Sequence, residues 1–174
     1  MLINLTEYFE VKHKQSDISV PIELNEIESD GIKYPVLSKD ELKFHFGLTG
    51  DGKLVIDGST NFSLEGSCDR CLKSVKIEVP IEFTYTVVKP DGYHEIDEDD
   101  EQGFMDGYEL DTEILIYNEL LMSLPMKVLC KETCKGLCPV CGKNRNDGEC
   151  GCDTFVPDPR MAAIKDIFNA NKEV

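Results

Sequence analysis

The strongest pattern in the chain is an alternation of apolar and polar residues that begins at residue 42. Up to residue 64 the even-numbered positions are apolar, at Leu42, Phe44, Phe46, Leu48, Leu54, Ile56, Phe62 and Leu64. A period of two residues is typical of a strand with one buried face. Gly50-Asp51-Gly52 interrupts the row, and a three-residue loop there would place residue 48 opposite 54 and 46 opposite 56. The sequence therefore predicts a β-hairpin with both apolar rows on one face.

A second alternation gives the longest strand signal. Its odd-numbered positions are apolar, at Ile77, Val79, Ile81, Phe83, Tyr85 and Val87. Three antiparallel strands that share one buried face form a twisted meander. Weaker alternation at residues 18–22 and 34–37 indicates two more strands, and each of them contains a proline, which favours a sheet edge or the start of a strand. Residues 1–40 otherwise give no clear pattern.

The pattern also indicates helices. Asp111 is suited to cap a helix over residues 112–124, and Pro125 would end it. Its apolar face is broad and predicts burial against the sheet; it comprises Ile114, Leu115, Tyr117, Leu121 and Leu124, widened by Ile116, Leu120 and Met122. Asp158-Pro159-Arg160 predicts the start of a short final helix. The expected class is α+β: an antiparallel meander or open, barrel-like sheet packed by one buried helix, followed by a small zinc-knuckle region and a final short helix.

Charge divides the chain of 174 residues into two predicted regions. Residues 130–174 hold seven basic and seven acidic residues, so residues 1–129 carry the whole net charge of −16. The predicted regions are an acidic α+β body over residues 1–129 and a cysteine-rich segment over residues 130–174. An acidic body does not attract phosphates, so an RNA contact would fall on the cysteine-rich end or near Cys68. A basic protein would suit the acidic body. The run Glu95–Glu101, with six acids in seven positions, predicts a solvated loop whose role stays open.

Several features are missing from the sequence. No apolar stretch approaches the length of a membrane span, and the first residues lack the pattern of a signal peptide, so we expect a cytoplasmic protein with no membrane partner. The chain has no nucleotide-binding motif, and none of its three histidines lies in a ligand or triad setting. These observations predict a protein that is not an enzyme, with no catalytic residue and no small-molecule substrate.

The cysteines carry the chemistry. In a reducing compartment a dense cysteine cluster is more typical of metal binding or redox activity than of disulfides. Two tight pairs near the end of the chain are joined by a short loop of turn-forming residues, and four such thiolates suit a tetrahedral Zn²⁺. The predicted structural zinc ligands are Cys138, Cys141, Cys150 and Cys152.

The remaining four cysteines form two looser pairs that could make a second site. Such a site would join the strand region to the segment after the helix, and its ligands would be Cys68, Cys71, Cys130 and Cys134. The sequence thus predicts one or two structural zinc ions. Two alternatives stay open: the looser pairs are reduced packing cysteines, or Cys134 replaces one ligand of the first site.

Basic residues surround both groups of cysteines. They are Arg70, Lys73, Lys76, Lys131, Lys135, Lys143 and Arg145. If the two groups meet in space, these side chains form a basic patch on an acidic protein and become the candidates for contact with RNA or another partner. The alternative is that they are scattered, solvated charges.

The order of the motifs resembles one protein family. The matching residues are Cys68-Asp69-Arg70-Cys71-Leu72, Ser123-Leu124-Pro125, residues 130–146, Cys150-Gly151-Cys152 and Asp158-Pro159-Arg160. Over residues 40–170 the chain resembles the YceD family of large-ribosomal-RNA accumulation proteins. The resemblance implies a non-enzymatic role in the synthesis, processing or stability of large-subunit ribosomal RNA, with ribosomal RNA or a basic ribosomal protein as partner. Members of the Gram-negative type keep C-x-R-C but lack most of the later cysteines, which implies that zinc is a structural addition.

The alternative function is a redox-regulated binding protein, such as a zinc-switch chaperone. That kind of chaperone also places a C-x-C and a C-x-x-C pair on one zinc, but there the C-x-C pair comes first. A zinc-stabilised adaptor with no link to RNA is a third possibility. The sequence leaves open the RNA site or protein partner, the zinc stoichiometry and the oligomeric state.

Overall fold

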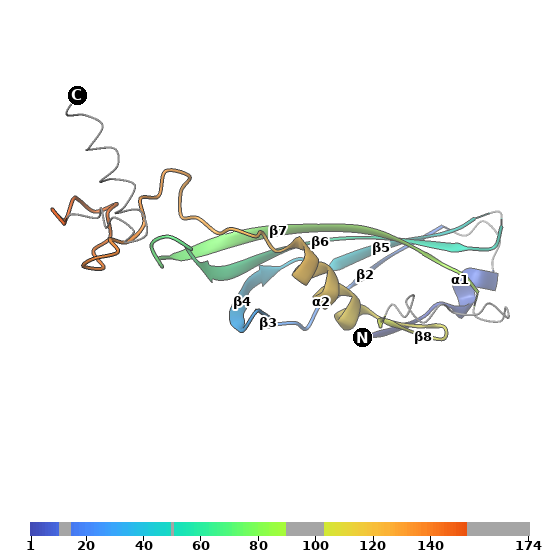
Figure 1. The fold of residues 1–174 in the computed structure, drawn as a ribbon. Helices are drawn as coiled ribbons and strands as arrows, with labels where there is room; N and C mark the ends of the chain where they lie inside the picture. Colours follow the sequence, from blue (N-terminus) through green and yellow to red (C-terminus); the bar gives the residue numbers. More distant parts are fainter. Residues whose placement is uncertain (11–14, 50, 90–102, 153–174) are drawn as a thin grey trace, which may run out of the picture. The chain divides into compact units, whose positions relative to one another are not determined.

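The computed structural model describes residues 1–10, 15–49, 51–89 and 103–152, which form two compact units (Figure 1). The sheet unit comprises Met1–Ser67 and Ser74–Val128. The cysteine unit comprises Cys68–Lys73 and, among the described residues, 129–152. All eight cysteines of the chain lie in the cysteine unit. The division predicted at residues 129 and 130 stays a prediction, and it differs from the two units in the placement of residues 68–73 and of Leu129.

The sheet unit is built on one curled antiparallel sheet that forms a half-barrel. Its strands are β2 (Ser16–Val20), β3 (Glu26–Ser29), β4 (Ile32–Lys39), β5 (Leu42–Leu48), β6 (Leu54–Ser67) and β7 (Ser74–Val87). They follow the order β2-β5-β6-β4-β3, and β7 pairs with β6 along the entire length of that strand. The predicted hairpin register is confirmed, because Leu48 faces Leu54 and Phe46 faces Ile56.

Strand β6 organises the sheet because it is long enough to pair with two strands in succession. Residues 54–59 pair with β5, and Phe62–Leu64 pair with β4 across an irregularity between Val36 and Ser38. The hairpin of β6 and β7 is the longest feature of the unit (Figure 1). The connection between these two strands carries Cys68 and Cys71, so the strand pairing fixes both ends of the first C-x-x-C segment.

The two weaker strand predictions are also confirmed, but the proline of the second strand, Pro35, lies neither at a sheet edge nor at the start of its strand. Residues 18–20 lie in β2, an edge strand that ends before Pro21. Residues 34–37 lie in β4, which has β6 on one side and β3 on the other. Pro35 is tolerated there because it faces Glu26 of β3, while the pairing of β4 with β6 begins only at Val36.

Helix α2 (Thr112–Ser123) confirms the predicted helix and its cap. The Asp111 carboxylate accepts hydrogen bonds from the backbone N–H groups of Glu113 at 3.0 Å and Ile114 at 3.3 Å. The helix packs against β7 and β3 (Figure 1). Its predicted face was wrong in part, since Ile114 and Met122 are exposed and the buried positions are Thr112, Leu115, Ile116, Glu119 and Leu120.

A buried acidic residue contributes to the choice of the buried face of α2. The Tyr85 hydroxyl on β7 donates a hydrogen bond to the Glu119 carboxylate. Burial and the adjacent carboxylate raise the pKa of Tyr85 to about 12. A carboxylate next to the sheet requires such a partner, because an unpaired buried polar group is costly.

Several short elements show no pattern in the sequence. They are β1 (Leu2–Asn4) and α1 (Thr6–Glu10), together with β8 (Met105–Asp106) and β9 (Glu109–Asp111) later in the chain. Strands β1, β9 and β8 form a second, three-stranded antiparallel sheet. The backbone N–H of Thr112 donates to the Met1 carbonyl at 3.0 Å, so the start of α2 is held next to the start of the chain.

Two sequence predictions fall outside the described residues: the acidic run at 95–101 and the final helix after Asp158. Within the described part of the chain, no helix combines the length and the apolar character needed to cross a membrane.

Candidate metal centres

The first C-x-x-C segment forms a closed backbone turn. In this first knuckle (residues 68–73), the N–H of Leu72 donates to the Cys68 carbonyl at 2.9 Å. The N–H of Cys68 donates to the Lys73 carbonyl at 2.8 Å. Leu72 has a φ of 59°, a left-handed conformation that closes the turn and brings Cys68 and Cys71 together.

The second C-x-x-C segment has the same backbone design. In this second knuckle (residues 138–143), the N–H of Gly142 donates to the Cys138 carbonyl at 2.9 Å, and the N–H of Cys138 donates to the Lys143 carbonyl at 2.8 Å. Gly142, at the position that matches Leu72, has a φ of 71°. The two knuckles are therefore a structural repeat, which the sequence hides because the cysteines are almost all that they share.

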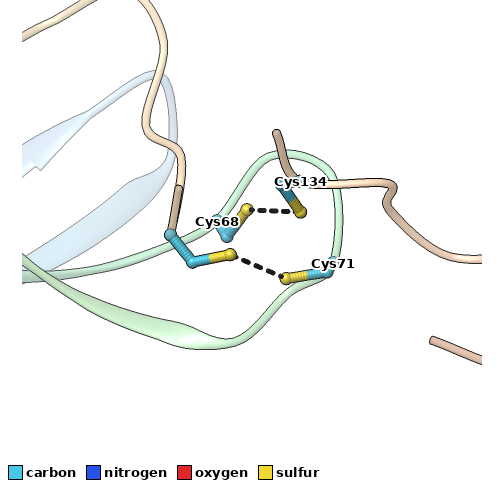
Figure 2. A group of neighbouring side chains, drawn as sticks. Cys68, Cys71 and Cys134 are labelled. Carbon is cyan, nitrogen blue, oxygen red and sulfur yellow. Dashed lines mark hydrogen bonds between the residues drawn. The ribbon is translucent and has the colours of Figure 1, made fainter. Parts of the chain in front are cut away.

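Four thiols gather at the first knuckle. The sulfur atoms of this first tetrad, Cys68, Cys71, Cys130 and Cys134, all lie within 4.8 Å of one another. The Cys68 and Cys134 sulfurs are 3.8 Å apart (Figure 2). The Cys71 and Cys130 sulfurs are 3.6 Å apart. A tetrahedral ion with Zn–S bonds of about 2.3 Å requires a sulfur separation of about 3.8 Å. The first tetrad could therefore hold a metal ion.

Arg70 holds the segment that supplies Cys134 against the first knuckle, through both its backbone and its side chain. The Arg70 carbonyl accepts a hydrogen bond from Leu137 N–H at 2.9 Å, and its guanidinium donates to the Cys134 carbonyl at 2.8 Å. Gly136 lies between them with a φ of 74°, and a Cβ there would come within 2.9 Å of the Arg70 carbonyl oxygen. Only glycine combines this backbone conformation with so close an approach.

The other four thiols gather at the second knuckle. The sulfurs of this second tetrad, Cys138, Cys141, Cys150 and Cys152, also lie within 4.8 Å of one another, so it too could hold a metal ion. The two tetrads differ in exposure. The first has three buried cysteines and the second has one, Cys138. Thus the second tetrad comprises the four predicted zinc ligands, and the first tetrad comprises the four cysteines of the possible second site. Cys134 does not join the second tetrad.

The backbone prepares some of these thiols to ionise. N–H groups of Cys141 and Val140 lower the pKa of Cys138 to about 6. Burial acts to raise the pKa of Cys68, but N–H groups from Cys130, Arg70 and Cys71 outweigh it and lower this pKa to about 6.

Other members of each tetrad resist ionisation. Burial and the neighbouring thiols raise the pKa of Cys130 to about 12. Hydrogen bonds with Cys141 and Cys150 raise the pKa of Cys152 to about 12. Four thiolates at this spacing repel one another, and a divalent cation supplies the charge that allows all of them to ionise.

Sequence reasoning missed one contact of the first tetrad. The side-chain amide of Asn146 donates to the Cys134 sulfur at 3.3 Å and is the largest cause of a lowered pKa at that thiol. In the sequence Asn146 is one of the turn-forming residues of the loop between Cys141 and Cys150. The one available signal was its place in the C-G-x-N-x-N motif, which gives no indication that it contacts the other tetrad.

Comparison with known proteins agrees with the motifs. The family described as "Large ribosomal RNA subunit accumulation protein YceD" matches residues 56–168. The chain belongs to the YceD family. Uncharacterized proteins of Mycobacterium tuberculosis and Mycobacterium bovis are 32% identical to it over 90 residues, which is 51% of this chain and 44% of theirs. The match thus spans less than half the length of these curated relatives, and no solved structure matches the chain.

In this YceD family member, six of the seven predicted contact residues lie in the cysteine unit: Arg70, Lys73, Lys131, Lys135, Lys143 and Arg145. All six are exposed, and the described part of the unit has only four acidic residues. The Lys73 Nζ atom lies 3.5 Å from the Asp147 Oδ1 atom. Lys76 belongs instead to β7 of the sheet unit, where it pairs with Glu78 at 2.6 Å.

Proposed function

We propose that this protein is a non-enzymatic, cytoplasmic factor of ribosome biogenesis that supports the accumulation of large-subunit ribosomal RNA. The family to which the chain belongs carries the proposal. In our proposal the cysteine unit is a zinc-stabilised surface that contacts the RNA, and the acidic sheet unit remains available to a basic ribosomal protein.

The two tetrads support a structural role for zinc. Cys68, Cys71, Cys130 and Cys134 would hold one Zn²⁺, and the second tetrad would hold another. A tetrahedral all-thiolate site leaves no open position for water or substrate, so it stabilises a fold rather than performing catalysis. When bound, the ion would supply the positive charge that keeps the four thiolates ionised and close together.

The charge distribution supports RNA contact through the cysteine unit. Phosphate contacts come from Lys and Arg side chains, and their number sets the salt dependence of binding. The exposed residues Lys131, Lys135 and Arg145 have no ion pair within the described part of the chain. These three are the leading candidates, because Arg70 already donates to a carbonyl and Lys143 donates to the Glu149 carbonyl at 3.2 Å.

Crosslinking followed by RNA sequencing tests this function. We expect enrichment of large-subunit precursor RNA, and we expect Lys131→Glu combined with Arg145→Glu to remove it. Lys33→Glu is the matched control, since Lys33 is an exposed lysine of the sheet unit, paired with Glu26 at 2.8 Å. Recovery of bulk RNA without enrichment would contradict the proposal, as would equal loss from the control.

Peroxide treatment distinguishes the redox alternative. A zinc-switch chaperone would release zinc and gain hydrophobic dye binding after oxidation. The proposed factor is expected to show no gain of chaperone activity, because zinc has a structural role in it.

A further inference from the structure

One residue of the second tetrad's loop contacts the first tetrad. Asn146 lies between Cys141 and Cys150, so its loop is bounded at both ends by ligands of the second tetrad. Its side-chain nitrogen nevertheless lies 3.3 Å from the sulfur of Cys134, which belongs to the first tetrad.

The orientation of the Asn146 amide is set by its neighbours. Its side-chain oxygen accepts a hydrogen bond from Lys135 N–H at 3.0 Å, and a backbone N–H can only donate. The amide nitrogen must therefore face the Cys134 sulfur. The Asn144 side-chain oxygen accepts from both the backbone N–H and the side-chain nitrogen of Asn146, at 2.9 and 2.8 Å.

The same loop is tied to the first tetrad by its backbone. Arg145 N–H donates to the Gly136 carbonyl at 2.9 Å, and Leu137 and Asn144 form an isolated β-bridge. An ion in the second tetrad would fix Cys141 and Cys150, and with them both ends of this loop. An ion at the second tetrad would therefore also restrict the position of Asn146.

We propose that Asn146 couples the two metal sites: an ion at the second tetrad orders the loop and holds the Asn146 amide against Cys134, so that the first tetrad binds its ion more tightly. This inference rests on the proposed zinc centres. A hydrogen bond to an ionised sulfur is charge-assisted, and it stabilises the thiolate that binds the metal. Such outer contacts are typically worth about 10- to 100-fold in metal affinity. Because coupling is reciprocal, a filled first tetrad strengthens the second by the same factor.

A double-mutant cycle on the full chain tests the coupling, with Co²⁺ as the probe and a competing chelator to set the free concentration. Cys150→Ser with Cys152→Ser disables the second tetrad, and Asn146→Ala removes the amide without adding charge. We expect each change to weaken Co²⁺ binding at the first tetrad by about 10- to 100-fold. The combined variant should be no weaker than the more severe of the two, because both changes remove the same contact.

Asn146→Asp provides a second readout that does not depend on disabling the second tetrad. It keeps an acceptor for Lys135 N–H but loses the donor to sulfur, so the thiolate-to-Co²⁺ charge-transfer band should move to lower energy. Asp147→Asn is the matched control, since it makes the reverse exchange one residue along the same loop and faces Lys73 instead of a sulfur. It should leave the band and the affinity unchanged.

The outcomes separate the coupling from the metal centres. The coupling alone would be overturned if the unmodified protein binds two ions but the two losses of Co²⁺ affinity multiply in the combined variant. An unshifted charge-transfer band in Asn146→Asp would also overturn it. A first tetrad that binds no Co²⁺ in the unmodified protein would overturn the zinc centre and the coupling with it.

Discussion

The two units of this protein have opposite kinds of interior. The sheet unit buries a continuous cluster of aliphatic and aromatic side chains, among them Phe44, Phe46 and Phe62. In the described part of the cysteine unit, the buried residues are four cysteines and Gly136. One region therefore has its own hydrophobic stabilisation, and the other has thiols at the positions where a core would lie.

This difference indicates what each unit needs in order to fold. Burying one large apolar side chain stabilises a fold by about 1.5–3 kcal/mol, and the sheet unit buries many. A structural zinc contributes about 10–16 kcal/mol of apparent binding free energy in small zinc domains, and that energy is also folding energy. We therefore expect the cysteine unit to need metal ions in order to fold and the sheet unit to fold without them.

Metal removal should give the largest effect and separates the units most clearly. We expect a strong chelator to abolish hydrogen-exchange protection over residues 129–152, because in our proposal metal ions take the place of a core there. Protection in β5, β6 and β7 should remain, since Phe46, Ile56 and Ile81 are buried without any metal. Restoring Zn²⁺ should restore the protection, and protection of residues 129–152 that survives chelation would contradict the comparison.

The reverse experiment removes part of the hydrophobic core. Phe62→Ala should lower the free energy of unfolding of the sheet unit by about 3–5 kcal/mol in urea, because Phe62 is 1% exposed. Metal stoichiometry measured under native conditions should not change. Leu37→Ala is the control, since Leu37 is 53% exposed and its loss should cost less than about 0.5 kcal/mol. Loss of metal from Phe62→Ala would show that the units do not fold independently.

The same contrast explains what the sequence predicted well. The register of β5 and β6 followed from alternation and loop length, because a slip by one residue would expose every apolar side chain of the row. The grouping of Cys138, Cys141, Cys150 and Cys152 was predicted from spacing, because a short loop joins two tight pairs; the grouping of the other four cysteines was one of several open alternatives. In both cases one short-range rule was sufficient.

Other features depend on contacts between distant residues and could not be predicted. Helix α2 is apolar on most of its sides, so periodicity could not select the face around Leu115. The hydrogen bond that the Tyr85 hydroxyl donates to the Glu119 carboxylate helps to select it. The contact of Asn146 with Cys134 needs two loops to be placed together. Strand β1 and helix α1 are too short to show a period.

A smaller effect is expected at high pH, and it should belong to the sheet unit. The folded-state pKa of Tyr85 is raised from 10 to about 12, so the folded state holds this proton more tightly than the unfolded state. The corresponding stabilisation is complete below pH 10 and is lost as the pH rises towards 12. As the pH rises across this range, the urea concentration at the midpoint of unfolding should fall more steeply for the unmodified protein than for Tyr85→Phe. Equal slopes would show that the proton of Tyr85 does not contribute.

The smallest expected effect is a difference in backbone strain between the two knuckles, read out as metal affinity. Gly142 adopts its left-handed conformation without strain, whereas Leu72, at the matching position with a φ of 59°, pays about 1–2 kcal/mol. Leu72→Gly should therefore tighten metal binding at the first tetrad by up to about tenfold, and Gly142→Ala should weaken the second tetrad by a similar factor. Chelator competition measures both. The Leu72 side chain is 68% exposed, so burial offers little compensation for its strain. If Leu72→Gly instead weakens metal binding at the first tetrad, the leucine side chain must stabilise the knuckle by more than its backbone strain costs. The two knuckles would then share a backbone conformation but differ in what stabilises it.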